Sequence, residues 1–510
     1  MKSKLFLFLI SLLFLFSCNV VKKKKDNKDT ETLLLAALIN ADAANRCNGF
    51  WAIDFQTNLY HCVAAIKKAS NDKLEIYIQS GLEEKQASYG LSPVNYTEVL
   101  NIYSTKIYPA LSSTFGEITD INKDGKLTLF IVDNNLGEYT GTYVAGYVDP
   151  VNYIEDYGSG VDLRSNMREI LYIDGFYLLY SKKLSLQEGR PDSFYSTLSH
   201  ELQHLLRLPY EFKKPGLTSY IPLPRTQSEY YYFQSLTFDT IWINEGTSEV
   251  ASDISGYGPQ YSRMECFMGD PTGGCSGGFN GKPLLKWSSS ILNYSFAYAF
   301  MKYLYYNSST SDSGRNKFFL ESLKGNSLGY RANTTKNFFE LYKTTENYDS
   351  SLLGTDNLSI YKRMYALFLA QTLSFPSTAN IYDGNSTAVA STSLQARYTY
   401  PSDLRQLSEY PSSIQAVDAK RFILEPSQVY RVKGTVSSAV TDTVIVQGNS
   451  EYLIFNSSLE DKKYVDSPIT SVQTAKHKCG MIDLQNRWVT KQVPQTLKYY
   501  ATLKDLRSGF

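Results

Sequence analysis

The chain has 510 residues, of which 43% are hydrophobic and 20% are charged. This apolar content is enough for a sizeable core and excludes a wholly disordered chain. Lysine and arginine total 51 against 50 aspartates and glutamates, so the chain lacks the basic excess that nucleic-acid binding requires. No nucleic-acid partner is therefore expected. At roughly 150 residues per domain, the length indicates about three structural units.

The N-terminus has the organisation of a secretory signal peptide. Two lysines precede an apolar run at Leu5–Phe16, which is too short to span a bilayer as a helix. The segment Leu15–Cys18 resembles the lipobox of bacterial lipoproteins, which implies lipid attachment to Cys18. An ordinary signal peptide followed by an unrelated cysteine is the alternative. We expect a signal peptide at 1–17, a charged flexible tether at 18–46, and an exported protein held by its lipid at a membrane of the cell envelope, at the outer membrane or cell surface.

Residues 47–198 alternate between strand and helix patterns. Strands are expected at Leu74–Gln79, which alternates with period two, at Leu127–Val132, which is nearly all apolar and is predicted to be buried, and at Ile170–Asp174. A helix is expected at Asn95–Phe115. These elements predict a mixed β/α lobe.

The segment before the second of these strands resembles the first part of a calcium-binding EF-hand loop. Asp120, Asn122 and Asp124 place oxygen atoms at its first, third and fifth positions. The twelfth position is Ile131 instead of the usual glutamate, so Ca²⁺ would need another ligand, such as Thr128 or a distant carboxylate. A polar turn without a metal is the alternative.

Helical spacing at residues 192–208 surrounds the pattern His-Glu-x-x-His. His200 and His204 are four residues apart, so both imidazoles project from one helix face and can bind one metal ion. Glu201 points to the side, where a catalytic water would lie. In a chain with four histidines, this pattern arises by chance on the order of once per thousand such chains. We predict one catalytic Zn²⁺ per chain, with three protein ligands and one open position.

A second helical segment, Trp242–Glu249, resembles the Asn-Glu-x-x-Ser-Asp signature of the gluzincins, the thermolysin-like metallopeptidases. The resemblance implies that Glu245 is the third zinc ligand and that Glu249 orients a zinc-bound histidine. Two features depart from the signature. Glu249 stands where aspartate is usual, and the segment between His204 and Glu245 is longer than in thermolysin.

The wider pattern is similar to the hyicolysin-type metallopeptidases, secreted bacterial gluzincins. The matching segments are residues 120–125, Gly146–Pro150, Ser165–Asp174, the two zinc segments, and Trp287 with Asn293-Tyr294. The resemblance implies an α+β, thermolysin-like catalytic domain, with a β/α lobe at 47–198 and a helical lobe at 199–400 that carries the zinc site. Strand patterns at Arg421–Leu424, Tyr430–Val436, Thr443–Val446 and Tyr452–Phe455 predict a small β domain at 401–510.

These motifs predict a zinc endopeptidase acting on protein or peptide substrates. Glu201 would serve as the general base for a zinc-activated water. Related aminopeptidases use a tyrosine on a helix after the zinc segments, and Tyr294 has a similar place in the order, although a structural tyrosine is the alternative. The Gly-x-Met-x-Asn signature of those aminopeptidases is absent from the sequence. Two other functions stay open, a zinc aminopeptidase and a surface adhesin on a peptidase-like scaffold.

Six cysteines and an exported chain make disulfides permissible. Proximity in sequence favours Cys47–Cys62 and Cys266–Cys275, although pairing does not follow from sequence alone.

Overall fold

The computed structural model describes residues 47–55, 59–134, 143–153, 156, 164–211, 240–269, 275, 277–287, 291–325, 331–383, 388–404, 414–415, 425–433, 443–448, 451–459 and 488–492. Residues from Gly49 onward belong to one compact unit. The expected signal peptide, tether, Cys18 and the strand at Arg421–Leu424 lie outside the described residues. Within those residues, no helix combines the length and apolar character needed to cross a membrane.

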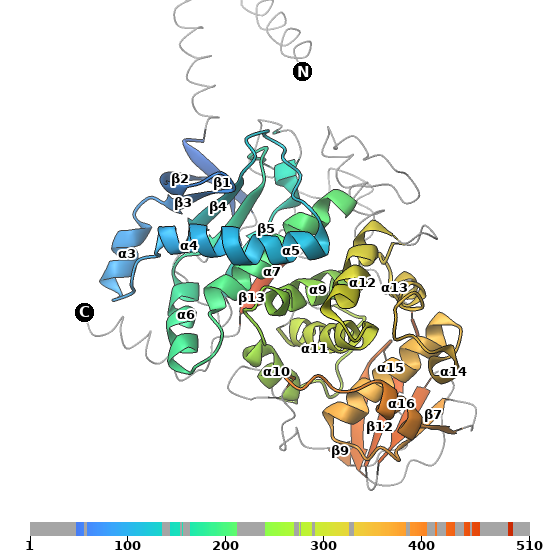
Figure 1. Cartoon of the computed structure of the whole chain (residues 1–510). Coiled ribbons are helices and arrows are strands. Elements are labelled where there is room, and N and C mark those ends of the chain that lie inside the picture. Colours follow the sequence, from blue (N-terminus) through green and yellow to red (C-terminus); the bar gives the residue numbers. More distant parts are fainter. Residues whose placement is uncertain are drawn as a thin grey trace, which may run out of the picture. The chain divides into compact units, whose positions relative to one another are not determined.

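The first sheet has seven strands in the order β1-β2-β3-β4-β6-β5-β13 (Figure 1). Its strands are β1 (Gly49–Asp54), β2 (Leu59–Ser70), β3 (Leu74–Gln79), β4 (Leu127–Val132), β6 (Ile170–Asp174), β5 (Tyr143–Val148) and β13 (Trp488–Gln492). The pairs β3–β4 and β4–β6 are parallel, whereas the pairs β1–β2, β2–β3, β5–β6 and β5–β13 are antiparallel. The three strands expected from the sequence are confirmed as β3, β4 and β6.

Both faces of this sheet are covered. Leu129 and Ile131 of β4 enter the main apolar core with the helices, whereas Phe130 and Val132 enter a second cluster. The alternation follows from the pleat, because successive side chains of a strand point to opposite faces. The buried members of the second cluster all come from strands of the same sheet, and Phe50 of β1 contacts Phe130 with ring centroids 5.1 Å apart. The sheet therefore curls over this face.

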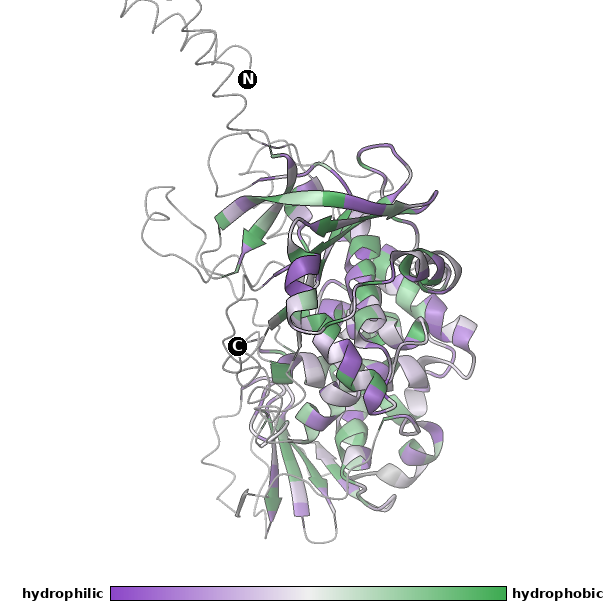
Figure 2. Ribbon diagram, turned by 90° about the vertical axis from the view of Figure 1, so that its left-hand side faces the viewer, coloured by the Kyte–Doolittle hydropathy of each residue, from purple (hydrophilic) through white to green (hydrophobic). Residues whose placement is uncertain are grey.

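A group of buried helices covers the other face. Helix α7 (Ser193–Glu211) contacts β5, β6 and β13 and packs on α9 (Ile241–Ile254). Helix α9 in turn packs on α11 (Ile291–Ser308), which contacts α10 (Tyr261–Met268) and α15 (Asn357–Thr372). Figure 2 shows hydrophobic and hydrophilic residues mixed along the helices, as expected where one face of a helix is buried.

The remaining helices are short. They are α3 (Leu82–Ser88), α4 (Tyr96–Ile102), α5 (Tyr108–Phe115), α6 (Tyr177–Gln187), α12 (Asp312–Lys324), α13 (Thr335–Tyr342), α14 (Ser350–Leu353) and α16 (Ser391–Arg397). The helix expected at Asn95–Phe115 is α4 and α5 joined by a π-helical turn at Tyr103–Ile107. Asn95 is the N-cap of α4, and its side chain accepts a hydrogen bond from the backbone N–H of Glu98.

The second sheet has the order β8-β7-β11-β12-β10-β9. Its strands are β7 (Asn380–Asp383), β8 (Ala388–Ala390), β9 (Ile414–Gln415), β10 (Val429–Lys433), β11 (Thr443–Gln447) and β12 (Glu451–Asn456). Two of these strands precede residue 401, and β13 pairs with the first sheet instead. The chain is thus α+β, as expected, and the division into domains at residues 198 and 400 stays a prediction.

Candidate metal centre

Helix α7 brings two imidazoles together. His200 and His204 are fully buried, and their Nε2 atoms lie 3.2 Å apart. The helix is held in place by Leu198, Leu202 and Leu205, which are also fully buried in the main core. Because the two nitrogens approach from one face of one rigid helix, their separation is set by the backbone.

Helix α9 adds a carboxylate to the same point. Oε2 of Glu245 lies 3.2 Å from Nε2 of His200 and 3.7 Å from Nε2 of His204. Two ligand atoms about 2.0–2.1 Å from a tetrahedral zinc ion are separated by roughly 3.3 Å, so the three distances match the edges of such a site. Oε2 of Glu245 is buried and makes no hydrogen bond of acceptable geometry within the described part of the chain. A cation bound among these atoms would satisfy that oxygen.

Burial sets the protonation of the three groups. It lowers the pKa of His200 to about 4 and holds the pKa of His204 well below its usual value, so both imidazoles are neutral at pH 7. The neutral imidazole is the form that binds metals. Burial also raises the pKa of Glu245, which opposes its ionised form. A divalent cation would reverse that effect by favouring the carboxylate.

The second nitrogen of each imidazole also has a neighbour. Nδ1 of His204 lies 3.1 Å from Oδ1 of Asn244 and 3.1 Å from Oγ of Ser248. Nδ1 of His200 lies 3.7 Å from Oε1 of Glu249. Such partners orient a ligand histidine, as Asn244 and Ser248 do for His204. Nδ1 of His200 makes no hydrogen bond among the described residues.

Glu249 is held by α10 and the residue before it. Nε of Arg263 donates to Oε1 of Glu249 over 2.8 Å, and Nε2 of Gln260 donates to Oε2 over 2.7 Å. Arg263 is 1% exposed, so the ion pair is almost fully desolvated. Glu249 thus lies near the second ring nitrogen of His200, and its role in orienting that histidine stays a prediction. Arg263 and Gln260 could not be predicted from the sequence, because their contacts join separate elements.

Glu201 is fully buried beside the two histidines and lies against β5. A Cβ atom added at Gly146 of β5 would stand 2.9 Å from Cγ of Glu201 and 3.0 Å from the carbonyl oxygen of Tyr172. Only glycine leaves this room, which explains a glycine in the middle of a strand. Gly146 is thus a further residue of the candidate site. The only sequence feature that pointed to it was its position in Gly146–Pro150, a segment that resembles the hyicolysin-type metallopeptidases.

Tyr294 of α11 borders the same centre. Its side chain is 3% exposed, its ring contacts that of Trp287, and the Arg263 guanidinium lies 5.3 Å from the ring centroid. Burial first, and then the charges of Glu245 and other nearby carboxylates, raise the pKa of Tyr294 well above its usual value. The phenol stays protonated at all physiological pH values and can donate a hydrogen bond.

The remaining predicted residues lie elsewhere. Asp120, Asn122 and Asp124 form a turn before β4, at a separate group of carboxylates. Cys266 of α10 forms a disulfide with Cys275, with Cα atoms 5.0 Å apart. Cys47 and Cys62 are each disulfide-bonded.

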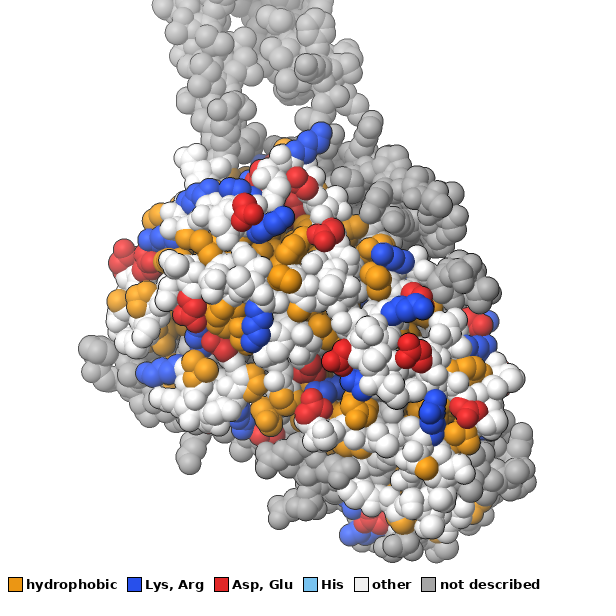
Figure 3. Space-filling model, in the orientation of Figure 1, with side chains coloured by type: hydrophobic (Ala, Val, Ile, Leu, Met, Phe, Trp, Pro, Cys, Tyr) orange, Lys and Arg blue, Asp and Glu red, His pale blue; other side chains and the backbone are white. Residues whose placement is uncertain are grey.

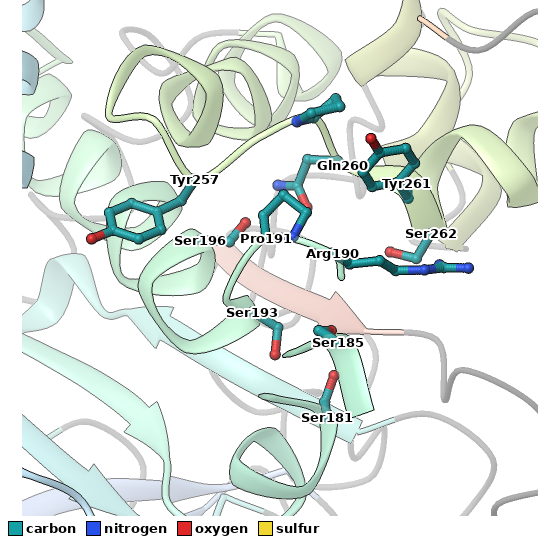
Figure 4. Close-up of a pocket in the computed structure, with 11 residues that line it drawn as sticks. Ser181, Ser185, Arg190, Pro191, Ser193, Ser196, Tyr257, Gln260, Tyr261 and Ser262 are labelled. Atoms are coloured by element: carbon teal, nitrogen blue, oxygen red, sulfur yellow. The ribbon is translucent and has the colours of Figure 1, made fainter. Parts of the chain in front are cut away.

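A polar pocket lies beside the centre, lined mostly by serine and tyrosine side chains (Figure 4). None of the three candidate ligands lines it, but Gln260, which holds Glu249, does. Arg190 at its edge is paired with Glu265 and Glu188, so its charge is already balanced. On the face in Figure 3, acidic and basic side chains are intermixed, in keeping with the neutral net charge.

The sequence is similar to a neutral metalloprotease, ShpI of Staphylococcus hyicus. The two are 25% identical over 289 residues, which make up 55% of this chain and 55% of the relative. The aligned region thus spans about half the length of that protein. No protein-family model matches the sequence.

Proposed function

We propose that this chain is a zinc metalloendopeptidase on a thermolysin-like, hyicolysin-type scaffold. The observation that carries the proposal is the convergence of His200, His204 and Glu245 on one buried point, with ligand atoms 3.2–3.7 Å apart. The similarity to a neutral metalloprotease supports the same reaction class. Two nitrogens and one carboxylate oxygen are a donor set typical of catalytic zinc, which leaves one position open.

Bound zinc would supply a Lewis acid that lowers the pKa of a water molecule from 15.7 to about 7 and polarises the scissile carbonyl. Glu201 is the general base: its carboxylate accepts a proton from the attacking water and later delivers it to the leaving amine. Tyr294 is protonated and donates a hydrogen bond to the oxyanion that develops on the carbonyl oxygen. Such a donor contributes about 3–4 kcal/mol to transition-state stabilisation. Asn244 orients His204 through a hydrogen bond, and the Glu249 carboxylate lies near His200.

Two other functions are distinguished by simple measurements. A zinc aminopeptidase would cleave peptides with a free N-terminus and spare blocked ones. An adhesin on the same scaffold would bind proteins without cleaving them, and the complete set of ligands and base argues against that choice.

The deciding experiment compares metal content with peptidase activity in three proteins. Wild-type protein should carry about one zinc per chain and cleave a casein-type substrate, and it should lose activity on chelation. Glu201→Gln should keep its zinc and fold but lose activity by at least two to four orders of magnitude. His204→Ala should lose the metal as well. Wild-type protein that is metal-free, and inactive after zinc is added, would refute the proposal, as would full activity in Glu201→Gln.

We further propose that the protein is exported and held at the membrane by lipid on Cys18. Replacing Cys18 with alanine should then move the protein from the membrane fraction to the soluble fraction. The check is fractionation together with mass spectrometry of the N-terminal peptide. A wild-type N-terminus without lipid, or unchanged partition of Cys18→Ala, would count against the anchor.

A further inference from the structure

A second group of acidic side chains lies at the start of two neighbouring strands. Asp120, Asp124 and Glu169 each place one carboxylate oxygen within 4.8 Å of the others. Asp120 and Asp124 belong to the turn that leads into β4, and Glu169 directly precedes β6. Because β4 and β6 are parallel neighbours, their starting ends meet at one edge of the sheet. This group is separate from the metal centre on α7 and α9.

The turn itself already has the form of a cation-binding loop. Oδ1 of Asp120 accepts a hydrogen bond from the backbone N–H of Asp124, and Oδ2 accepts from Gly125, over 3.1 Å each. Gly125 has a φ of 71°, which permits the sharp turn at this position. Ile131, at the twelfth position of the loop, is buried in β4. The loop therefore lacks its own glutamate ligand, as the sequence indicated.

Glu169 places a carboxylate beside the loop, where a further ligand would be needed. Its side chain is only 1% exposed, and its Oε1 atom accepts a hydrogen bond from the backbone N–H of Ile121 in the loop. Its Oε2 atom is buried and has no hydrogen-bond partner among the described residues. A buried carboxylate oxygen left without a donor is costly, unless a cation occupies the space in front of it. Burial, and then the neighbouring aspartates, raise the pKa of Glu169, which a bound cation would counter.

We propose that Asp120, Asp124 and Glu169 bind a calcium ion that joins the start of β4 to the start of β6. All three ligands are carboxylates, and oxygen-only sites select hard cations over zinc. The Arg168 guanidinium lies 3.5 Å from Oδ2 of Asp124 and 3.1 Å from Oε1 of Glu75. One arginine shared by two carboxylates leaves the three-carboxylate group with excess negative charge. The Thr128 hydroxyl faces Glu75, to which it donates a hydrogen bond over 3.0 Å.

The test is calorimetric titration of CaCl₂ into the full chain, solubilised in detergent and freed of metals. Wild-type protein should bind about one Ca²⁺ with a Kd of roughly 10⁻⁴–10⁻³ M, the range of extracellular calcium modules. Calcium should also raise the melting temperature. Glu169→Gln and the exposed Asp124→Asn should each bind at least tenfold more weakly and lose the shift in melting temperature.

Two controls separate this site from the zinc centre. Glu84→Gln removes an exposed carboxylate on α3, outside the group, and should leave calcium binding unchanged. His204→Ala should also bind calcium normally, so the outcome does not depend on the proposed peptidase activity. Absence of binding to wild-type protein at about 10 mM Ca²⁺, or equal binding by wild type and both carboxylate variants, would overturn the proposal.

Discussion

Glu201 and Gly146 touch across the interface between α7 and β5, and this contact fixes the proposed general base. Gly146→Ala would place a methyl group 2.9 Å from Cγ of Glu201, with the Tyr172 carbonyl oxygen behind it at 3.0 Å. The side chain of Glu201 has to move to make room, and we expect the three candidate ligands to keep their positions. A displacement of about 1 Å in a catalytic group lowers the rate by roughly 10²-fold. We expect kcat of Gly146→Ala to fall by about that factor with zinc content unchanged.

The measurement is kcat on a casein-derived peptide, together with zinc analysis of the same samples. The control is Glu84→Gln, which changes an exposed side chain of α3 that belongs to neither proposed metal site. Its activity should equal that of wild type. Unchanged kcat in Gly146→Ala would show that Glu201 does not depend on this contact.

Residues that act through spacing along one helix could be predicted from the sequence. His200 and His204 are separated by one helical turn, so their joint action follows from the helix period alone. Glu245 required the resemblance to a known signature, because it lies on another helix. Arg263 and Glu169 were missed as partners, since their roles arise from contacts between elements that no local pattern encodes.

At the level of elements, α10 holds Arg263 in position to form its ion pair with Glu249. The disulfide Cys266–Cys275 closes a loop of 9 residues at the end of this helix, and both cysteines are buried. In the chain-entropy model, such a loop stabilises the folded state by about 2–3 kcal/mol. Replacing both cysteines with alanine should lower the free energy of unfolding by about that amount, as measured by urea denaturation.

The oxidised wild-type protein is the reference for this variant. Reduced wild-type protein cannot replace the variant, because reduction also opens the bond at Cys62. If the double variant unfolded at the same urea concentration as the oxidised wild type, the disulfide would contribute nothing to stability.

Strands β3, β4 and β6 were predicted correctly because each is a short apolar run between turn signals. The same reasoning missed α6, whose apolar residues include Leu178 and Leu179 next to a polar second half. It also missed β13, because pairing with β5 joins residues that are more than 300 positions apart in the chain. Long-range pairing leaves no trace in local periodicity.

At the scale of the whole molecule, the second sheet shares the main apolar core with the helices. The ring of Tyr365 on α15 lies 4.9 Å from that of Phe455 on β12, and its hydroxyl donates to the carbonyl oxygen of Ser427. Val429, Val444 and Phe455 belong to the same buried cluster as Leu202 of α7. The strand pattern predicted a sheet here, but not that the sheet would share its core with the helices.

The pairing of β13 with β5 bears on how a substrate would reach Glu201. β5 is the strand that touches this base, and β13 occupies its outer edge from Val148↔Trp488 to Tyr143↔Gln492. Extended peptides commonly add to a free strand edge through main-chain hydrogen bonds. Deleting residues 460–510 would free that edge, so we expect a roughly tenfold lower KM for extended peptides with kcat little changed. Steady-state kinetics of the deletion variant are the measurement.

The same deletion combined with Glu201→Gln should be inactive. That result would show that any gain in activity of the deletion variant arises at the proposed metal centre. A deletion variant that loses zinc and helical circular dichroism would instead show that β13 serves the fold. Because β13 belongs to the same chain as β5, it competes with a substrate peptide for the edge of β5. Its effective concentration at that edge is high, and a free peptide has to exceed it in order to bind there. If the proposed peptidase reaction is correct, the intact protein would therefore discriminate against extended peptides, and removal of β13 would weaken that discrimination.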